Sequence, residues 1–302
     1  MVIAVPAFEA EAHIGRVLSE LLAQRYEHFR VVLLDDASED ATFEVAERIA
    51  ASDERLTVRR NASRIGLSRN WNAAIDAARE LHPGADLFAW AGHHDEWHPD
   101  WLSSLVAQLD ERPEAVLAYP LDGYRGDDGR EVAGAAPFAT RAVRDPRVRL
   151  SLAARHMVAG SMVYGLLRLD ALLRVGGLEP VLYPDRLLIA RIAWLGEFAQ
   201  EQRVLWRRRL TAEPTRRRQR QAIHPGTPPL HSYLPVSLVH GAVLLRAGVP
   251  APTVAGYTCR RLVRDAVGYV ARGLYRAEGH APASVSRLLR RGVGLPERKV
   301  SR

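Results

Sequence analysis

Two histidines and two acidic residues stand together directly after a short apolar run. Residues Leu87 to Ala91 are all apolar, a length typical of a buried parallel strand, and Gly92 ends the run. The motif His93-His94-Asp95-Glu96 follows at once. Imidazole and carboxylate groups together can hold a divalent cation. A plain polar loop between a strand and a helix is the alternative, because His and Asp are ordinary loop residues.

Two further polar clusters stand at predicted strand ends. Pro6-Ala7-Phe8-Glu9 follows a first apolar run, and Asp35-Asp36 ends a second one. Open α/β sheets bind ligands at the carboxyl ends of their strands, so we expect these clusters to lie beside His94-Asp95. Carboxylates there can accept hydrogen bonds from a base or ribose, or hold a cation that binds a diphosphate. Capping of the next helix is the alternative for Asp35-Asp36.

Strands alternate with helices in the first third of the chain. The apolar pattern predicts strands at 2–5, 30–34, 56–60 and 87–91, and helices at 9–23, 41–51, 68–81 and after Pro99. This alternation favours an α/β fold, a mostly parallel, Rossmann-like sheet flanked by helices.

The second part of the chain has a looser pattern. It predicts strands at 116–120, 162–168 and 204–206, a hairpin at Asp128-Gly129, and helices at 148–156, 169–175 and 185–195. Beyond Pro225 it predicts basic amphipathic helices at 232–247, 252–276 and 282–291. We therefore expect an α/β domain at 1–222 and a basic α-helical C-terminal extension at 223–302.

The charge balance favours anionic partners. Lys and Arg number 42 against 35 acidic residues, a net charge of +7. The single cysteine, Cys259, excludes an internal disulfide and fits a reducing cytoplasm. We expect no signal peptide and no membrane-spanning helix, because no basic leader precedes an apolar run and no run reaches about 18 apolar residues.

Four stretches resemble the family 2 glycosyltransferases, which have the GT-A fold. Val5 to Thr42 is similar to the family's opening, in which a Pro-x-aromatic turn and a helix precede a strand that ends in Asp-Asp-x-Ser-x-Asp. Asn61 to Ala78 resembles the Asn-x-x-x-x-Gly loop and its helix, and Trp90 to Leu102 stands in the place of the Asp-x-Asp segment. Gly160 to Phe198 resembles the acceptor-side region.

The resemblance implies an inverting glycosyltransferase that moves a sugar from a nucleotide-diphosphate-sugar to a hydroxyl acceptor, such as a cell-envelope or lipid-linked glycan. Asp185 matches the base that deprotonates the acceptor. The alternative is an acid stabilised by its helix dipole. The resemblance implies that Asp36 and the first cluster bind the base and ribose, and that Arg69 lies near the diphosphate. The expected donor-binding residues are Pro6, Ala7, Glu9, Asp35, Asp36, Arg69, His94 and Asp95.

The metal segment departs from the family pattern. Where the family usually has Asp-x-Asp-Asp, this chain has Gly92-His93-His94-Asp95, so both acids of the Asp-x-Asp are replaced. The resemblance implies a divalent metal, Mn²⁺ or Mg²⁺, with His94 and Asp95 as the expected ligands, although imidazole suits Mg²⁺ less well. The replacement leaves open a metal-independent enzyme, or a non-catalytic relative that binds a partner or a membrane surface.

A run of arginines follows the last predicted strand. Its members are Arg203, Arg207, Arg208, Arg209, Arg216, Arg217, Arg218 and Arg220. One or two could clamp a diphosphate and the rest could contact anionic lipid, while a solvated surface is the alternative. Basic C-terminal helices favour a peripheral contact at the inner face of the membrane. No nucleic-acid motif is present, and no Gly-x-Gly-x-x-Gly follows the first strand, which disfavours a dinucleotide-binding oxidoreductase.

Overall fold

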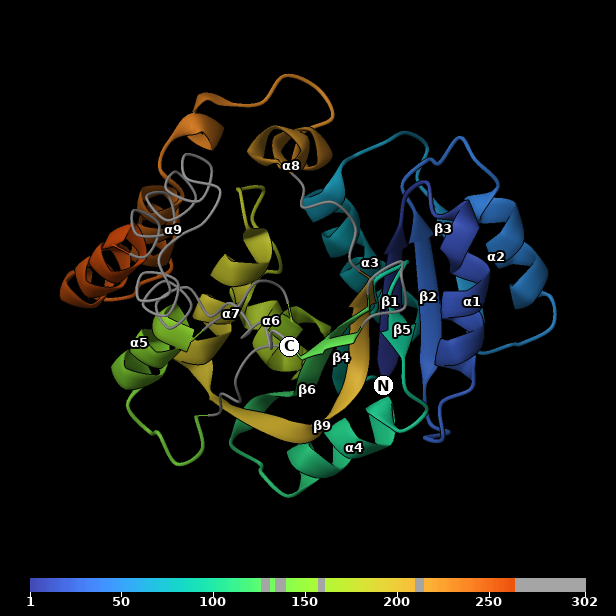
Figure 1. The fold of residues 1–302 in the computed structure, drawn as a ribbon, viewed down its shortest axis with the longest axis horizontal. Coiled ribbons are helices and arrows are strands. Elements are labelled where there is room, and N and C mark those ends of the chain that lie inside the picture. The colour runs from blue at the N-terminus through green and yellow to red at the C-terminus, as the bar shows by residue number, and fades with distance from the viewer. Residues whose placement is uncertain (126–130, 134–139, 157–160, 210–214, 264–302) are drawn as a thin grey trace, which may run out of the picture.

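A computed structural model describes residues 1–125, 131–133, 140–156, 161–209 and 215–263 of the chain, which form a mixed sheet with helices on both faces (Figure 1). The strands are β1 (Val2–Ala7), β2 (Arg30–Asp35), β3 (Leu56–Arg60), β4 (Leu87–Trp90), β5 (Glu96–Trp97), β6 (Ala115–Arg125), β7 (Glu131–Ala133), β8 (Leu166–Arg168) and β9 (Glu197–Arg209). The helices are α1 (Glu11–Leu22), α2 (Thr42–Ala50), α3 (Leu67–Leu81), α4 (Trp101–Asp110), α5 (Pro146–His156), α6 (Leu169–Val175), α7 (Pro184–Leu195), α8 (Arg216–Ile223), α9 (Val236–Arg246) and the 3₁₀ turns η1 (Ser161–Tyr164) and η2 (Leu230–Tyr233). Residues 251–263 are also helical.

The sheet has a parallel half and a mixed half. Its order is β3-β2-β1-β4-β8-β6-β9-β5, with β7 paired to β6. The strands β3, β2, β1 and β4 are parallel, which confirms the predicted alternation. Beyond them β8 runs antiparallel to β4 and β6, and β9 runs parallel to β6. The short β5 pairs antiparallel with β9, so the loop after β4 lies against that long strand.

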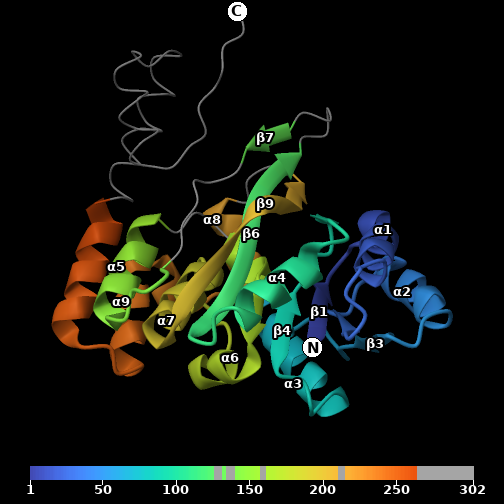
Figure 2. The ribbon, with the colours of Figure 1, turned by 90° about the horizontal axis from the view of Figure 1, so that it is seen from below.

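Successive side chains of each strand point to opposite faces of the sheet, which divides the core into two layers. In β1, Ile3 and Val5 belong to the layer that contains α1, α2 and α4, while Val2 and Ala4 belong to the layer that contains α3, α6 and α7. This is the period-two burial expected of a sheet covered on both faces. Figure 2 shows α1 and α2 at one end of the sheet and α5, α7 and α9 at the other.

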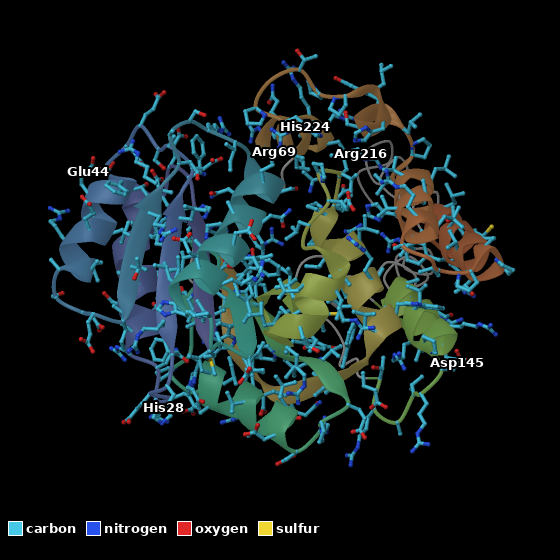
Figure 3. The ribbon with its side chains drawn as sticks, turned by 180° about the vertical axis from the view of Figure 1, so that it is seen from behind. His28, Glu44, Arg69, Asp145, Arg216 and His224 are labelled. Carbon is cyan, nitrogen blue, oxygen red and sulfur yellow. The ribbon has the colours of Figure 1, made fainter. Side chains whose placement is uncertain are left out.

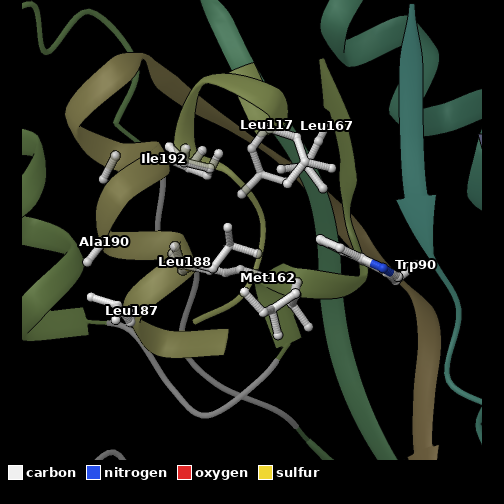
Figure 4. Close-up of a cluster of buried hydrophobic side chains, with 14 of the residues drawn as sticks. Trp90, Leu117, Met162, Leu167, Leu187, Leu188, Ala190 and Ile192 are labelled. Atoms are coloured by element: carbon white, nitrogen blue, oxygen red, sulfur yellow. The ribbon is translucent and has the colours of Figure 1, made fainter. Parts of the chain in front are cut away.

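The helix α7 lies in the second layer and is apolar on several sides. Its Leu187, Leu188 and Ile192 pack with Met162 and with strand residues such as Trp90 (Figure 4). Buried residues of α9 and of 251–263, including Val243 and Tyr257, belong to the same cluster. The expected division at residue 222 stays a prediction, and the described residues after it share this core.

Several predicted elements have different bounds. The strand expected at 162–168 divides into η1 and β8. Gly165 lies at the break, where a Cβ would collide with the Ala118 carbonyl oxygen. The strand expected at 204–206 is the 13-residue β9, whose charged residues and register shifts against β6 hide the apolar alternation. The helix α8 was not predicted. The hairpin at Asp128-Gly129 and the helix at 282–291 lie outside the described residues. In the described ranges, no helix is long and apolar enough to cross a membrane.

Candidate functional site

The end of β1 contributes backbone carbonyls to the carboxyl edge of the sheet. Pro6 and Ala7 are buried. The Pro6 carbonyl lies 3.1 Å from Nδ1 of His93, and the Ala7 carbonyl accepts the N–H of Asp36 at 2.9 Å. Glu9 has a left-handed φ of 47° and an exposed side chain at the rim. The three polar clusters that the sequence places at strand ends therefore meet at this edge.

Asp35 is a buried carboxylate that fixes the turn after β2. It accepts the backbone N–H of Ser38 at 3.1 Å and the Ser38 hydroxyl, and it pairs with Nε of Arg60 at 3.2 Å. The helix α2 begins after Ala41 without a side-chain cap. Asp35 therefore holds its own turn and does not cap α2, and a direct contact with a donor stays a prediction.

Asp36 shapes the loop that leads into α3. Its Oδ1 accepts Nδ2 of Asn61 at 2.9 Å and the N–H of Ile65 at 2.8 Å, and its Oδ2 accepts the N–H of Gly66 at 2.9 Å. Asn70 accepts a second hydrogen bond from Asn61 at 2.9 Å. Because a carboxylate has about four acceptor positions, Asp36 can hold this loop and still accept one hydrogen bond from a ligand.

Asp95 joins the loop after β4 to the end of β9. Its Oδ2 accepts Nε1 of Trp206 at 3.1 Å, and its Oδ1 accepts the N–H of Arg209 at 3.4 Å. A side chain at Gly92 would place its Cβ 2.5 Å from Oδ2, so glycine makes room for the carboxylate. Burial raises the pKa of Asp95 to about 6, against the charge of Arg208 and the hydrogen bond from Trp206.

His93 and His94 are partly buried and neutral at physiological pH. Burial lowers the pKa of each to about 4. For His94, the charges of Arg208, His13, Arg16 and Arg209 lower the pKa further. Two further residues of the site, His13 and Arg16, were not among the residues expected from the sequence. Both lie on α1 and face this loop, and their spacing of three residues along a helix is the signal that could have shown it.

His94 and Asp95 do not form the ligand set that a divalent cation needs. The Asp95 carboxylate is buried, and it is held by Trp206, by the Arg209 amide and by Nε2 of His94 at 3.4 Å. Among the residues that the structure describes, no three His, Cys, Asp or Glu side chains gather as a metal site. A cation would meet one imidazole, one occupied carboxylate and several arginines. These residues therefore do not fit the predicted metal.

Asp185 lies at the second position of α7. Tyr183 caps the helix with a left-handed φ of 54°, and Pro184 takes the first helical position, where its missing N–H does no harm. Burial raises the pKa of Tyr164, and the charges of Asp95 and Asp185 both act on it in the same direction. Asp185 and Asp95 are thus electrostatic neighbours of one tyrosine. Within the described residues, no hydrogen bond or ion pair engages the Asp185 carboxylate.

Arg69 lies near the end of α8, away from the loop that contains His94 and Asp95 (Figure 3). It is exposed in the first turn of α3. Burial is the main cause of the lowered pKa of His224, and the charge of Arg69 lowers that pKa further. Figure 3 shows Arg69 beside His224 at the end of α8, with Arg216 farther along the same region. A Cβ at Gly66 would lie 2.7 Å from the Ile223 carbonyl, so α8 closes over the loop that Asp36 holds. Contact of Arg69 with a diphosphate stays a prediction.

Tyr164 and Trp206 form the aromatic wall of the site. Their ring centroids lie 4.8 Å apart, and Tyr164 also lies 5.9 Å from Trp71. Neither residue stands out in the sequence as a site residue, because lone aromatic residues are ordinary core residues. The pairing of β5 with β9, which matches Trp97 with Trp206, brings Trp206 to the loop after β4.

Curated relatives match part of this chain. A segment of 130 residues, 42% of this chain, is 31% identical to polypeptide N-acetylgalactosaminyltransferase 4 of Caenorhabditis elegans and covers 21% of that protein. A segment of 120 residues, 39% of the chain, is 26% identical to the putative teichuronic acid biosynthesis glycosyltransferase TuaG of Bacillus subtilis and covers 44% of it. The chain thus spans less than half the length of these relatives.

Solved structures share the fold over most of the chain. Residues 1–349 of S. aureus TarS in complex with UDP-GlcNAc match with a TM-score of 0.63 at 16% identity, over 86% of this chain and 71% of that one. The mannosyltransferase PcManGT of Pyrobaculum calidifontis, in complex with GDP-Man and Mn²⁺, matches with a TM-score of 0.55 at 19% identity, over 96% and 78%. These matches confirm the predicted GT-A fold. The model of glycosyl transferase family 2 matches residues 2–161, more than half of the chain, and the protein therefore belongs to that family.

Proposed function

We propose that the protein transfers a sugar from a nucleotide-diphosphate-sugar to a hydroxyl acceptor, with inversion at the anomeric carbon. The observation that carries the proposal is the position of Asp185. Its carboxylate lies in the first turn of α7 and no described residue engages it, and its charge acts on Tyr164, as does the charge of Asp95. A base is thus available beside the carboxyl edge of the sheet, where α/β proteins bind nucleotides.

The donor side of the proposal uses the edge formed by β1 and β2. Asp36 has one acceptor position left for the nucleotide base, and the Asp35 turn supports it. Pro6, Ala7 and Glu9 line the base and ribose. Arg64 lies over the ring of Phe8 with its Cζ 3.9 Å from the centroid, which gives the base a flat cationic and aromatic neighbour.

The transfer is a single displacement. Asp185 takes the proton of the acceptor hydroxyl, whose oxygen forms a bond to the anomeric carbon from the face opposite the diphosphate. The bond between that carbon and the diphosphate oxygen breaks, and its electron pair leaves with the nucleoside diphosphate. One in-line displacement inverts the anomeric configuration.

The acceptor is proposed to be a cell-envelope or lipid-linked glycan, reached by peripheral contact with the membrane. The relative TuaG is named for teichuronic acid biosynthesis, which supports an envelope acceptor. Exposed apolar side chains gather at η2 and α9, namely Leu230 at 89%, Tyr233 at 60%, Leu234 at 55% and Leu238 at 49% exposure. Arg220 of α8 lies over the Tyr233 ring at 4.5 Å, so basic and apolar residues adjoin. This combination suits an anionic bilayer surface.

Co-sedimentation with vesicles tests the membrane contact. We expect binding to vesicles that contain anionic lipid, and weaker binding to neutral ones. The double substitution Leu230→Ser and Leu234→Ser should release the protein. Leu173→Ser, at a 39% exposed residue on α6, is the matched control. Equal sedimentation of all variants would remove this surface from the proposal.

Turnover of the Asp185→Asn variant tests the catalytic proposal. We expect kcat to fall by roughly 10²–10⁴-fold, with donor binding retained, because only the base is lost. Asp170→Asn, at the same position of the neighbouring helix α6, is the matched control and should keep full activity. Transfer or donor hydrolysis by the unmodified chain would exclude a non-catalytic relative that only binds a partner. Unchanged turnover in Asp185→Asn would remove this residue from the role.

A further inference from the structure

We propose that the loop after β4 and the end of β9 form a metal-free diphosphate site, in which Arg208 and Arg209 supply the positive charge and Asp95 positions them. The proposal rests on the proposed function, because the diphosphate is that of the sugar donor. In this site Asp95, the acid that remains in the altered metal segment, supports the arginines and is not a metal ligand.

Cationic and imidazole groups from three elements converge on this loop. From α1, Nη2 of Arg16 donates to the His94 carbonyl at 3.0 Å. From β9, Nη1 of Arg209 lies 3.4 Å from Nδ1 of His13, again on α1. The loop itself adds His93, whose ring contacts the Pro6 carbonyl. The cluster therefore adjoins the proposed nucleotide site at Pro6. A diphosphate attached to the nucleotide would need its binding groups at such a position.

Asp95 acts as a positioning residue for this cluster. Its two oxygens bind Trp206 and the Arg209 amide, so the carboxylate fixes the end of β9 against the loop. The ladder between β5 and β9, which pairs Glu96 with Arg207, holds the same two segments together. Rigid support of this kind keeps guanidinium groups in place before a ligand arrives, which lowers the entropy lost on binding.

The charge balance of the altered segment favours an anion over a cation. Two carboxylates of an Asp-x-Asp would bind a divalent ion and repel a bare diphosphate. Gly92 and His94 stand in place of these acids and bring no negative charge, and an imidazole N–H can donate to a phosphate oxygen. Arg16 is paired with Glu20 at 2.8 Å, and the charge of Arg208 on β9 acts on the Asp95 carboxyl. Guanidinium groups bind phosphate oxygens in a bidentate manner and stay charged at every physiological pH.

Calorimetric titration with UDP, GDP, ADP, CDP and dTDP, in EDTA and in Mn²⁺, tests the proposal. We expect one diphosphate to bind in EDTA with a Kd within about threefold of the value in Mn²⁺. Arg209→Gln should weaken that binding by at least about tenfold, because a charge-assisted contact is lost. Arg217→Gln, at an exposed arginine of α8, is the matched control and should change the Kd by less than about twofold.

Two outcomes would overturn the metal-free site while leaving the proposed function in place. Binding that appears only with Mn²⁺ is one, and an Arg209→Gln variant indistinguishable from Arg217→Gln is the other. If no diphosphate binds in either buffer, the proposed function fails as well. Circular dichroism of each variant checks that the fold is retained.

The substitution His94→Asp supplies the reciprocal test. It restores an acid at the position of the missing second aspartate, beside Asp95. We expect binding in EDTA to weaken by at least about tenfold and to recover in part with Mn²⁺, because the new carboxylate repels the diphosphate until a cation neutralises it. Unchanged binding in EDTA would show that the diphosphate lies away from His94 and would contradict the assignment.

Discussion

Asn72 and Leu178 exchange two hydrogen bonds of 2.8 Å, although 106 positions separate them in the sequence. The Asn72 amide donates to the Leu178 carbonyl and accepts its N–H, as a neighbouring strand would. Gly177, with a φ of +73°, allows the close approach. This contact anchors the loop that leads to Asp185 onto α3. The proposed base therefore depends on a helix that otherwise supports the nucleotide side.

The substitution Asn72→Ala should damage both stability and turnover. It leaves one N–H and one carbonyl of Leu178 without their partner, which costs roughly 1–3 kcal/mol in the free energy of unfolding. The loop before α7 loosens, so we expect kcat to fall while donor binding is retained. Thermal unfolding and steady-state kinetics measure the two effects. Asp76→Ala, at an exposed residue of α3, is the control, and a variant as stable and active as that control would contradict this reading.

The sequence predicts the parallel half of the fold because local patterns specify it. Apolar runs mark β1, β2 and β4, and each is followed by the polar cluster that reaches the carboxyl edge. The family resemblance covers the same segments. These features are readable without tertiary contacts, since a buried parallel strand needs only a short apolar run and a turn signal.

The sequence marks the arginine run as a candidate diphosphate clamp, but which of its members lie beside Asp95 could not be predicted, because that depends on strand pairing. Arg209 reaches Asp95 only through the place of β9 between β6 and β5, and its register against β6 shifts at Pro120 and Leu121. The sequence shows β9 as a charged segment with a short apolar centre. His13 looks like an ordinary helix residue until Arg209 lies beside it. The sequence therefore suggests that Asp95 is a metal ligand, whereas the tertiary contacts favour a role in positioning the end of β9.

The substitution Asp36→Asn should disorganise the loop before α3. Asp36 accepts hydrogen bonds from Asn61, Ile65 and Gly66, and an amide offers one oxygen in place of two. At least one N–H then faces another N–H, which costs roughly 1–3 kcal/mol in stability. We expect donor binding to weaken by about tenfold or more as the loop shifts. Titration with the preferred nucleotide measures this, with Asp110→Asn at the exposed end of α4 as the control. Equal affinities in both variants would place the donor away from this loop.

His240 should make the protein less stable in mild acid. Burial lowers the pKa of His240 to about 4, against the hydrogen bond to the Leu182 carbonyl, and the charges of Arg261 and Arg186 lower it further. The unfolded chain has a pKa near 6.5, so it takes up the proton first as the pH falls. The contribution of neutral, buried His240 to the free energy of unfolding is therefore complete above pH about 6.5. It is lost as the pH falls toward 4, and the loss is on the order of 3 kcal/mol.

Urea unfolding at neutral pH and at pH about 5 measures the contribution of His240. We expect His240→Gln, whose amide can still donate to Leu182, to lose less stability between the two conditions than the unmodified chain. His28→Gln, at an exposed histidine, is the control. An identical pH dependence in all three proteins would show that His240 does not titrate with unfolding.

The buried guanidinium of Arg149 should be a strong determinant of stability. It is only 6% exposed, and it donates to four carbonyls, those of Ala193, Trp194, Val143 and Arg144, at 2.7–3.1 Å. Two of these belong to the last turn of α7, where carbonyls lack helical partners. Arg149 in α5 thus caps the C-terminal end of α7, the helix whose second residue is Asp185.

The substitution Arg149→Lys tests this capping, because it keeps the charge but cannot span four acceptors. We expect a loss of roughly 2–4 kcal/mol in the free energy of unfolding, since buried carbonyls and a buried charge lose partners. Arg147→Lys, exposed on the same helix, should have almost no effect. Chemical unfolding of both variants measures the difference. If Arg149→Lys were as stable as Arg147→Lys, the guanidinium would not be holding α7, and its end would have to be satisfied by water.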